Sequence, residues 1–333
     1  MINLKKICGC FTIILIGTCL QNVRADQVAS FPSLSFAVID STARELHKRF
    51  IYLQNNEKEK DNSVWAYGYG KELNIHNNIR ADVLLGGAEA GYDHKVYSKN
   101  GDHIFVGFTG GHLYSGDAKS HQNAGVRGIA DITVPYFGIY GAWMNNGGWF
   151  ANASARAFII NMATNLIDTI GDVTEFDYKR KYLASVMEFG RKLSYEMDAF
   201  SRLTMDMVGS FQYLYSGSRS TKVVSVGNLE DDPTQGIRTG VYGIFAYESI
   251  SMKADFVSRP FVRVGIAHEF DGVTDTRYSI ANYQNDFGGY RVELGAGYEL
   301  KLSGNKHLIF DIMYENGEFI DNFSTSFGGR YSF

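Results

Sequence analysis

The sequence contains few cysteines, prolines and tryptophans, and these shortages narrow what the chain can be. Its 333 residues include 3 cysteines, 4 prolines and 3 tryptophans. The cysteines are Cys8, Cys10 and Cys19, so nothing after Cys19 can form a disulfide or a thiolate metal site. A basic excess is missing too, with 32 basic against 36 acidic residues. This balance argues against a nucleic-acid partner.

Long apolar runs and catalytic motifs are also missing. After the N-terminal segment no stretch reaches the roughly 18 apolar residues of a transmembrane helix. The chain has no Gly-x-Ser-x-Gly and no His-Glu-x-x-His motif. His94, His103, His112 and His121 are regularly spaced, but the expected strands do not bring them together. We therefore expect no enzyme, no metal and no cofactor.

The first 25 residues resemble a secretory signal peptide. Lys5 and Lys6 precede an apolar run from Phe11 to Leu20, and small residues flank Arg24 before Asp26. This order of charge, apolar stretch and small residues predicts cleavage after Ala25 and export. The alternatives are an uncleaved anchor and a lipoprotein modified at Cys19.

The rest of the chain is rich in Gly, Phe and Tyr (36, 23 and 21 residues) and alternates with a period of two. From Trp149 to Ile159, odd positions are apolar, whereas Asn152, Ser154 and Arg156 occupy even ones. Successive side chains of a strand point to opposite faces, so each such segment has an apolar and a polar face. Twelve strands are predicted: 62–75, 79–97, 101–115, 126–145, 147–162, 178–196, 200–215, 235–248, 259–272, 289–300, 305–316 and 319–333.

The connections between these strands alternate between long and short. Long ones are expected near 116–125, 163–177, 216–234 and 273–288, which matches an outer-membrane barrel with long loops at one end. A soluble barrel would turn its apolar faces inward. Placing them toward outer-membrane lipid leaves the charged faces in a wet lumen. The residues predicted to face the lumen are Arg156, Asp206, Arg263, Glu269, Glu293 and Glu299.

Both ends of the mature chain carry patterns of their own. Between Asp40 and Asn56, Leu46, Phe50 and Leu53 share one helical face, and Ser41 or Thr42 can cap the helix. At the C-terminus, aromatic residues recur on odd positions. Phe327, Tyr331 and Phe333 belong to this stripe, which ends on the last residue.

The chain resembles the translocator domain of classical autotransporters, the type V secretion barrels of Gram-negative outer membranes. The motifs that carry the resemblance are Gly87–Asp93, Gly138-Ile-Tyr140 followed by Gly147–Phe150, Ser63–Gly68, and the C-terminal Gly328–Phe333. They extend over about residues 40–333. The resemblance implies a twelve-stranded antiparallel β-barrel whose C-terminal residues are read by the outer-membrane assembly machinery.

The resemblance also places the N-terminal helix inside the lumen, where Arg44, Lys48 and Arg49 suit a wall that carries carboxylates. Some family members cut themselves between two helix asparagines. Asn55-Asn56 follows the Arg-rich turn instead, so we expect no self-cleavage.

The predicted organisation is a signal peptide (1–25), a short segment without a folded passenger (26–39), a lumen helix with its linker (40–61) and the barrel (62–333). The predicted function is a translocator domain, stand-alone or without cargo, with a passive polar lumen plugged by a helix. The alternatives are a porin-like or structural barrel, and an adhesin whose loops bind a host or matrix surface.

Overall fold

The structure is a computed structural model, and it describes residues 30–54, 61–77, 80–121, 127–167, 173–223, 227–251, 256–278, 281–302 and 305–333. The predicted signal peptide, with Ala25, and the Asn55-Asn56 pair lie outside these ranges. No helix in the described part of the chain is long and apolar enough to cross a membrane.

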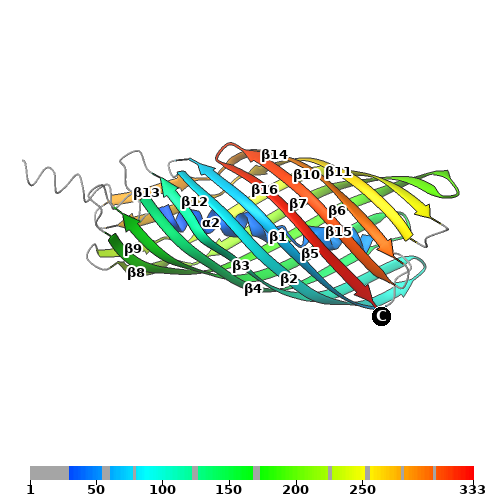
Figure 1. The fold of residues 1–333 in the computed structure, drawn as a ribbon, viewed down its shortest axis with the longest axis horizontal. Helices are drawn as coiled ribbons and strands as arrows, with labels where there is room; N and C mark the ends of the chain where they lie inside the picture. Colours follow the sequence, from blue (N-terminus) through cyan, green and yellow to red (C-terminus); the bar gives the residue numbers. More distant parts are fainter. Residues whose placement is uncertain are drawn as a thin grey trace, which may run out of the picture.

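Twelve strands of the described chain form a closed antiparallel barrel, as predicted (Figure 1). They are β1 (Asn62–His76), β2 (Arg80–Lys99), β3 (Asp102–His121), β4 (Arg127–Met144), β5 (Trp149–Ile167), β6 (Val173–Asp198), β7 (Ser201–Ser216), β10 (Thr234–Ser251), β11 (Phe256–Glu269), β14 (Gly289–Leu302), β15 (Lys306–Gly317) and β16 (Ile320–Ser332). The first strand pairs with the last from Ser63↔Ser332 to Ile75↔Ile320, which closes the sheet. A closed sheet has no edge, so the ladders can pair its backbone in lipid.

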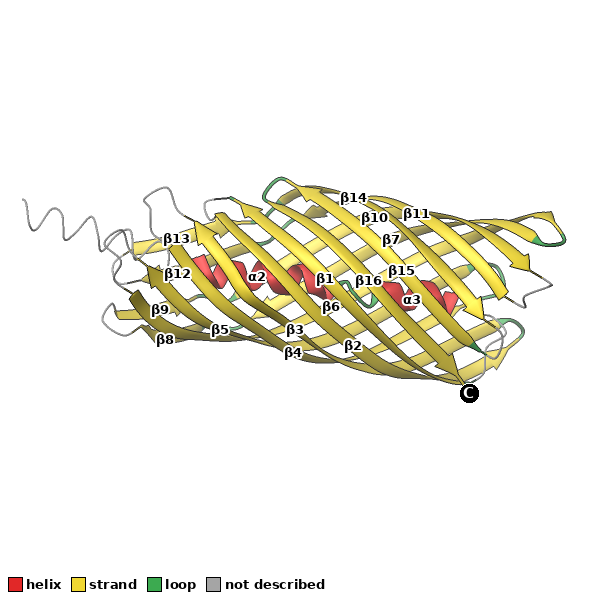
Figure 2. Cartoon of the chain, viewed as in Figure 1, coloured by secondary structure: helices red, strands yellow, loops and turns green. Residues whose placement is uncertain are grey.

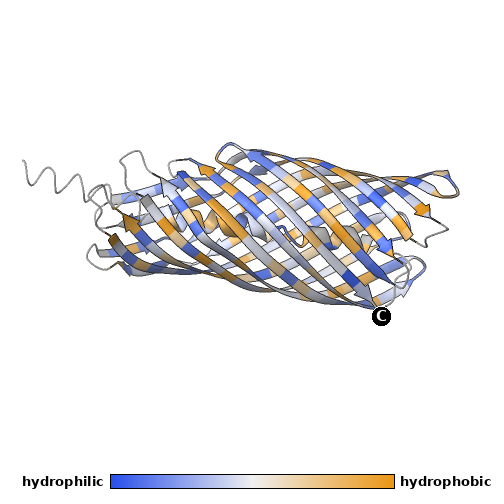
Figure 3. Ribbon diagram, viewed as in Figure 1, coloured by the Kyte–Doolittle hydropathy of each residue, from blue (hydrophilic) through white to orange (hydrophobic). Residues whose placement is uncertain are grey.

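The strand faces agree with the sequence pattern. Of the large hydrophobic residues on the outer surface, Val264, Leu294 and Phe327 are about half exposed, whereas their neighbours Arg263, Glu293 and Ser326 are buried inside the barrel. Figure 3 shows the resulting alternation of hydrophobic and hydrophilic residues along the strands. The outer surface therefore suits lipid.

The predictions of loops at 116–125 and 163–177 were wrong, because barrel strands continue into both segments. β3 extends to His121 into the predicted loop 116–125, and β5 and β6 occupy most of 163–177. The turn between β4 and β5 is short and uses Gly148 at a positive φ of 79°. These strand extensions lack a continuous apolar face, so the alternation that identifies the membrane-spanning part does not reveal them.

The two remaining predicted loops fold into a second sheet. β8 (Arg219–Val223), β9 (Gly227–Asp231), β12 (Val273–Tyr278) and β13 (Ala281–Asp286) form a four-stranded sheet in the described chain, in the order β13-β12-β9-β8. The two hairpins meet where β12 pairs with β9. They lie at the end of the barrel opposite the short β4–β5 turn (Figure 1). Since short turns of outer-membrane barrels face the periplasm, this sheet lies at the extracellular end.

The lumen helix differs from the prediction of one helix over 40–56. The described N-terminal part holds two helices, α2 (Ser30–Ala43) and α3 (His47–Gln54), joined by a short turn. Both lie inside the barrel along its length (Figure 2). Residues 30–39, which belong to the segment predicted to hold no folded passenger (26–39), are thus helical and buried. Ser41 and Thr42 do not cap a helix start, because both hydroxyls donate to the carbonyl of Val38 in the last turn of α2.

The facing assignment predicts that an outward charge on β5 is costly in proportion to its depth. Ala155→Arg should destabilise the barrel by roughly 2–4 kcal/mol if it lies near the midplane, whereas an interfacial position costs about 0–1 kcal/mol. Ala163→Arg is the matched control, since Ala163 is also exposed on β5 but lies nearer its extracellular end. Unfolding in lipid vesicles measures both. Equal losses would contradict the dependence on depth, and no loss in either variant would contradict the outward facing of these residues.

Candidate functional site: a lumen filled by the chain's own helices

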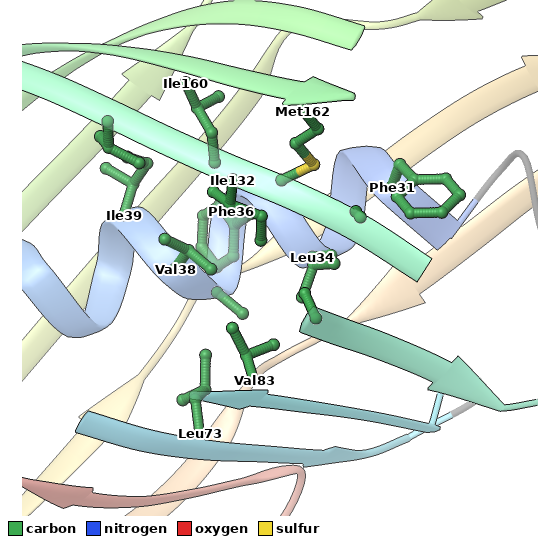
Figure 4. Close-up of a cluster of buried hydrophobic side chains, with 14 of the residues drawn as sticks. Phe31, Leu34, Phe36, Val38, Ile39, Leu73, Val83, Ile132, Ile160 and Met162 are labelled. Atoms are coloured by element: carbon green, nitrogen blue, oxygen red, sulfur yellow. The ribbon is translucent and has the colours of Figure 1, made fainter. Parts of the chain in front are cut away.

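The extracellular half of the lumen is an apolar core built around α2. Nearly all residues of α2 are buried, and its apolar side chains pack against inward-facing wall residues (Figure 4). Leu73, Val83, Ile132, Ile160 and Met162 belong to this wall. The phenyl ring of Phe36 stacks on Phe287 beside the second sheet, with ring centroids 5.4 Å apart. The prediction of a polar lumen is therefore wrong for this half.

The sequence did not predict the apolar section of the lumen because the strand pattern there is ambiguous. Wall positions such as Phe158 and Ile160 follow Arg156 in the inward register of β5. Ile159 and Ala157 alternate with them, so both faces of this stretch are apolar and a period of two cannot tell which one faces inward.

The other half of the lumen combines a second apolar cluster, which includes Leu46, Phe50 and Leu53, with many charged groups. The six residues predicted to line the lumen are all buried. The predicted residues form ion pairs in the wall: Arg263 with Glu293 (2.8 Å), Arg238 with Glu269 (3.3 Å), and Arg259 with both Glu299 (2.7 Å) and Asp206 (3.7 Å). Arg156 lies 3.5 Å from Glu89, which was not among the predicted residues. It also donates a hydrogen bond to the carbonyl oxygen of Thr42 near the end of α2.

The predicted helix cations bind wall carboxylates. Arg44, in the turn after α2, forms a bidentate ion pair with Glu293 of β14. Arg49 of α3 donates two hydrogen bonds to Asp93 of β2, both at 2.6 Å, and is fully buried. Parallel bonds of this kind fix orientation as well as attraction. The side chain of Lys48 lies outside the described residues, so its predicted role stays a prediction.

The helices also carry acids, which the reading of a basic helix missed. Asp40 accepts hydrogen bonds from Arg238, from Arg291 at 3.0 Å and from Gln212 at 2.6 Å. Glu45 forms an ion pair with Lys71 of β1. Residues of both signs on the helices therefore meet the opposite sign on the wall.

The imidazole of His47 adds a third kind of contact with the wall. It lies 2.7 Å from the carboxylate of Glu188 and 2.8 Å from the hydroxyl of Tyr242. The wall carboxylates Glu89 and Asp93, which pair with Arg156 and Arg49, were not among the predicted lumen residues. Their place in the Gly87–Asp93 motif was the one sequence signal for them.

Wall cations also determine where α2 ends. Lys71 donates to the carbonyl oxygen of Ser41, and Arg156 donates to that of Thr42 at 3.3 Å. The last carbonyls of a helix have no partner inside the helix, and the helix dipole favours a cation there. A cavity of about 40 Å³ beside the turn, lined in part by Arg44 and Asp311, has room for a few waters rather than a channel.

The second sheet, β13-β12-β9-β8, covers the extracellular end of α2. Ser33 lies 2.6 Å from the Thr274 hydroxyl of β12 and accepts a hydrogen bond from Asn285 of β13. On the other side, the hydroxyl of Tyr178 on β6 donates to Asp231 of β9 at 2.9 Å. Burial raises the pKa of the Asp231 carboxyl, although Arg180 and the Tyr178 hydroxyl oppose that shift. The sheet is thus tied both to the helix and to the barrel wall.

The C-terminal aromatic residues lie where the stripe predicts. Phe327, Tyr331 and Phe333 are exposed on the outer surface, and the rings of the last two stack with centroids 6.2 Å apart. The backbone N–H of Phe333 donates to the carbonyl of Asn62, so the terminal residue takes part in closing the barrel.

A closed barrel with an apolar exterior and its own N-terminal helices in the lumen defines a class of helix-plugged outer-membrane barrels. The chain matches the family model of the autotransporter beta-domain over residues 64–311, and it belongs to that family. Domains of this family are outer-membrane proteins of Gram-negative bacteria, and this chain is an autotransporter translocator β-domain.

Relatives and solved structures agree with this assignment. The chain is 26% identical over 276 residues to the BrkA autotransporter of Bordetella pertussis, covering 81% of this chain and 26% of that protein. It is 21% identical over 264 residues to the pertactin autotransporter of Bordetella bronchiseptica, covering 76% and 27%. The chain thus spans about a quarter of the length of these relatives.

Solved structures with a similar fold include the beta domain of the Bordetella autotransporter BrkA, with a TM-score of 0.67 at 22% identity over 82% of this chain and 100% of that one. The translocator domain of NalP from Neisseria meningitidis has a TM-score of 0.57 at 13% identity, over 88% and 98%. At these identities the structures support the fold alone.

The buried Arg49–Asp93 pair predicts strong coupling between helix and wall. Arg49→Leu should destabilise the barrel by about 3–5 kcal/mol, because it leaves a buried carboxylate without its cation. Arg49→Leu combined with Asp93→Leu should lose clearly less than the sum of the single variants. Chemical unfolding of the purified protein measures all three.

The control is Arg277→Leu, which breaks an ion pair with Glu230 that is about half exposed on the second sheet. An exposed pair contributes about 0–1 kcal/mol. If the lumen and surface variants lose the same amount, the helix is not held by its ion pairs.

Proposed function

We propose that the barrel carries chain that precedes α2 across the outer membrane, and that α2 and α3 remain in the lumen as the plug that closes it afterwards. The observation that carries this proposal is the position of the two helices. They extend through the lumen from the second sheet toward the short-turn end of the barrel, so α2 begins, at Ser30, on the extracellular side.

The fit between helices and wall supports a plug rather than a chain caught in passing. The apolar side chains of α2 meet an apolar wall, and Asp40, Arg44, Glu45, His47 and Arg49 each meet a polar or charged wall group. A sequence of another composition would bury unpaired charge at these places, which costs several kcal/mol per group.

The same position of the helices favours a translocator over a porin. A porin keeps a wet channel, whereas this lumen holds a dry apolar section around α2. The outer-membrane lipid, the assembly machinery and a signal peptide cut after Ala25 belong to the proposal, since export and membrane insertion require them. Binding of a host or matrix surface by the loops stays a prediction, as does the absence of catalysis.

A display experiment tests the proposal. An unstructured epitope inserted just before Ser30 should become accessible to antibody and protease on intact cells, because the lumen directs that end outward. The control carries the same epitope in the Asn100-Gly101 turn between β2 and β3, at the short-turn end, and should react only after the outer membrane is opened. If the epitope before Ser30 stays hidden while the barrel assembles, the barrel does not export the chain ahead of α2.

The C-terminal stripe predicts a role in assembly. Phe333→Ala should lower the amount of barrel in the outer membrane, because it removes the terminal aromatic residue that we expect the assembly machinery to read. Ser332→Ala is the matched control, since Ser332 is buried on the lumen face one residue earlier. The folded fraction is read from the heat-dependent gel shift, and normal assembly of Phe333→Ala would contradict this role.

A further inference from the structure

The outer wall from β2 through β7 to the edge of β10 is hollowed on its lipid side. Two overlapping hollows of about 800 Å³ and 690 Å³ share Val106, Gly141, Ala153 and Met187. We call this combined depression the wall groove. It lies on the surface that faces lipid, outside the plugged lumen.

The wall groove follows one row of paired residues across the strands. Val106 pairs with Gly141, Gly141 with Ala153, Ala153 with Met187, and Met187 with Phe211. The two small residues form the floor, and the large exposed side chains on either side form the walls. The groove is therefore a shape in the apolar surface, and its floor of small residues lies on the paired strands β4 and β5.

Packing inside the protein does not require the small residues of the floor. A Cβ added to Gly141 would come no closer than 3.6 Å to the carbonyl oxygen of Phe105, which is an ordinary contact. The same holds for Gly209 at the next row, where the nearest atom is a carbonyl oxygen at 3.8 Å. In contrast, a Cβ at Gly107 would fall 2.3 Å from the ring of Tyr140. The floor of the groove is thus open to an occupant from outside the chain.

A cation stands at the end of the groove. Ala151 pairs with Phe189 beside the central row, and the next outward pair toward the short-turn end is Trp149 with Arg191. The ring of Trp149 stacks on Phe189 at 5.3 Å, and the guanidinium of Arg191 lies 5.2 Å above the Trp149 ring. Within the described ranges, no carboxylate lies within ion-pair distance of exposed Arg191.

The depth of Arg191 in the membrane indicates which group can bind it. Trp and Tyr mark the membrane–water interface of barrels, so Trp149 places Arg191 at headgroup depth on the periplasmic side. An exposed guanidinium held over a ring is suited to bind a phosphate. The apolar groove continues from it toward the membrane centre.

We propose that the wall groove binds an acyl chain of an anionic glycerophospholipid from the periplasmic leaflet, with the lipid phosphate on Arg191. An apolar surface of a second barrel or of another protein's helix would fill the hollow but would bring no negative charge to Arg191. The charge complementarity between Arg191 and a phosphate therefore favours the lipid.

Fluorescence quenching by brominated lipid tests the proposal directly. Trp65 lies in the lumen and Trp143 borders the groove, so the Trp143→Phe protein leaves Trp149 as the lipid-facing reporter. It is reconstituted in vesicles of phosphatidylcholine that contain brominated phosphatidylglycerol or, separately, brominated phosphatidylcholine. We expect phosphatidylglycerol to be preferred about five-fold at Trp149, the factor that about 1 kcal/mol per interfacial cation gives. The preference should fall as salt is raised.

Matched variants separate the cation from the groove. Arg191→Gln should abolish the preference, and Lys306→Gln, which removes an exposed cation from the start of β15, should leave it unchanged. Ala153→Phe should fill the groove and weaken quenching by both lipids, whereas Ala66→Phe on the outer face of β1 should not.

Each variant is first shown to be assembled by its heat-dependent gel shift. Equal quenching by the two lipids in the Trp143→Phe protein would mean ordinary boundary lipid only and would overturn the proposal. A preference that survives Arg191→Gln would overturn it as well.

Discussion

The pairing of β1 with β16 is the interaction on which the rest of the structure depends. Lipid offers no water to an unpaired N–H or C=O group, so a sheet that crosses a membrane must close on itself. Once it closes, every strand has one face toward lipid and one toward the lumen. The terminal residue participates in this closure through the hydrogen bond from Phe333 to Asn62. The last strand thus closes the barrel and also carries the outward aromatic stripe.

Closure leaves a lumen that has to be filled or hydrated, and this barrel fills it in two ways. Around α2 the lumen is a core like that of a soluble protein, and its stability comes from apolar area removed from water. Around the turn and α3 it combines a second apolar cluster, which includes Leu46, Phe50 and Leu53, with a network of ion pairs. Such pairs lose much of their attraction to desolvation, so they specify where the helices sit more than they strengthen the fold.

The two kinds of packing have different consequences for transport. Around α2 the fit depends mainly on the shape of apolar side chains, whereas around the turn it depends also on which charge lies opposite each wall group. Asp40 and Arg44 show this dependence, since they are four residues apart in the sequence and bind wall groups of opposite charge, Arg291 and Glu293. The second sheet then covers the first turn of α2 through Ser33. In the proposed function, a plug held in this way closes the barrel behind the chain that it follows.

β5 shows how much one strand does in such a barrel. Its inward residues include Arg156, which bonds the end of α2, and its outward residues include Ala153, the floor of the wall groove. Alternation keeps these roles on opposite faces of a sheet that is one layer thick. A substitution on one face can therefore change lipid contact without changing the plug.

The sequence by itself determined the strand number, the lipid face and the inward position of the charged residues, because a period of two is a local property of the chain. It also grouped Leu46, Phe50 and Leu53, which the structure buries in one cluster, although Leu46 lies in the turn before α3 and not on the helix. Only the tertiary structure decided which charges meet: Arg49 and Asp93 are 44 residues apart, and Asp40 and Arg291 are 251 apart. The second sheet and the apolar half of the lumen were decided there too. Their residues acquire a buried face only when distant hairpins and α2 come together, so no local pattern records them.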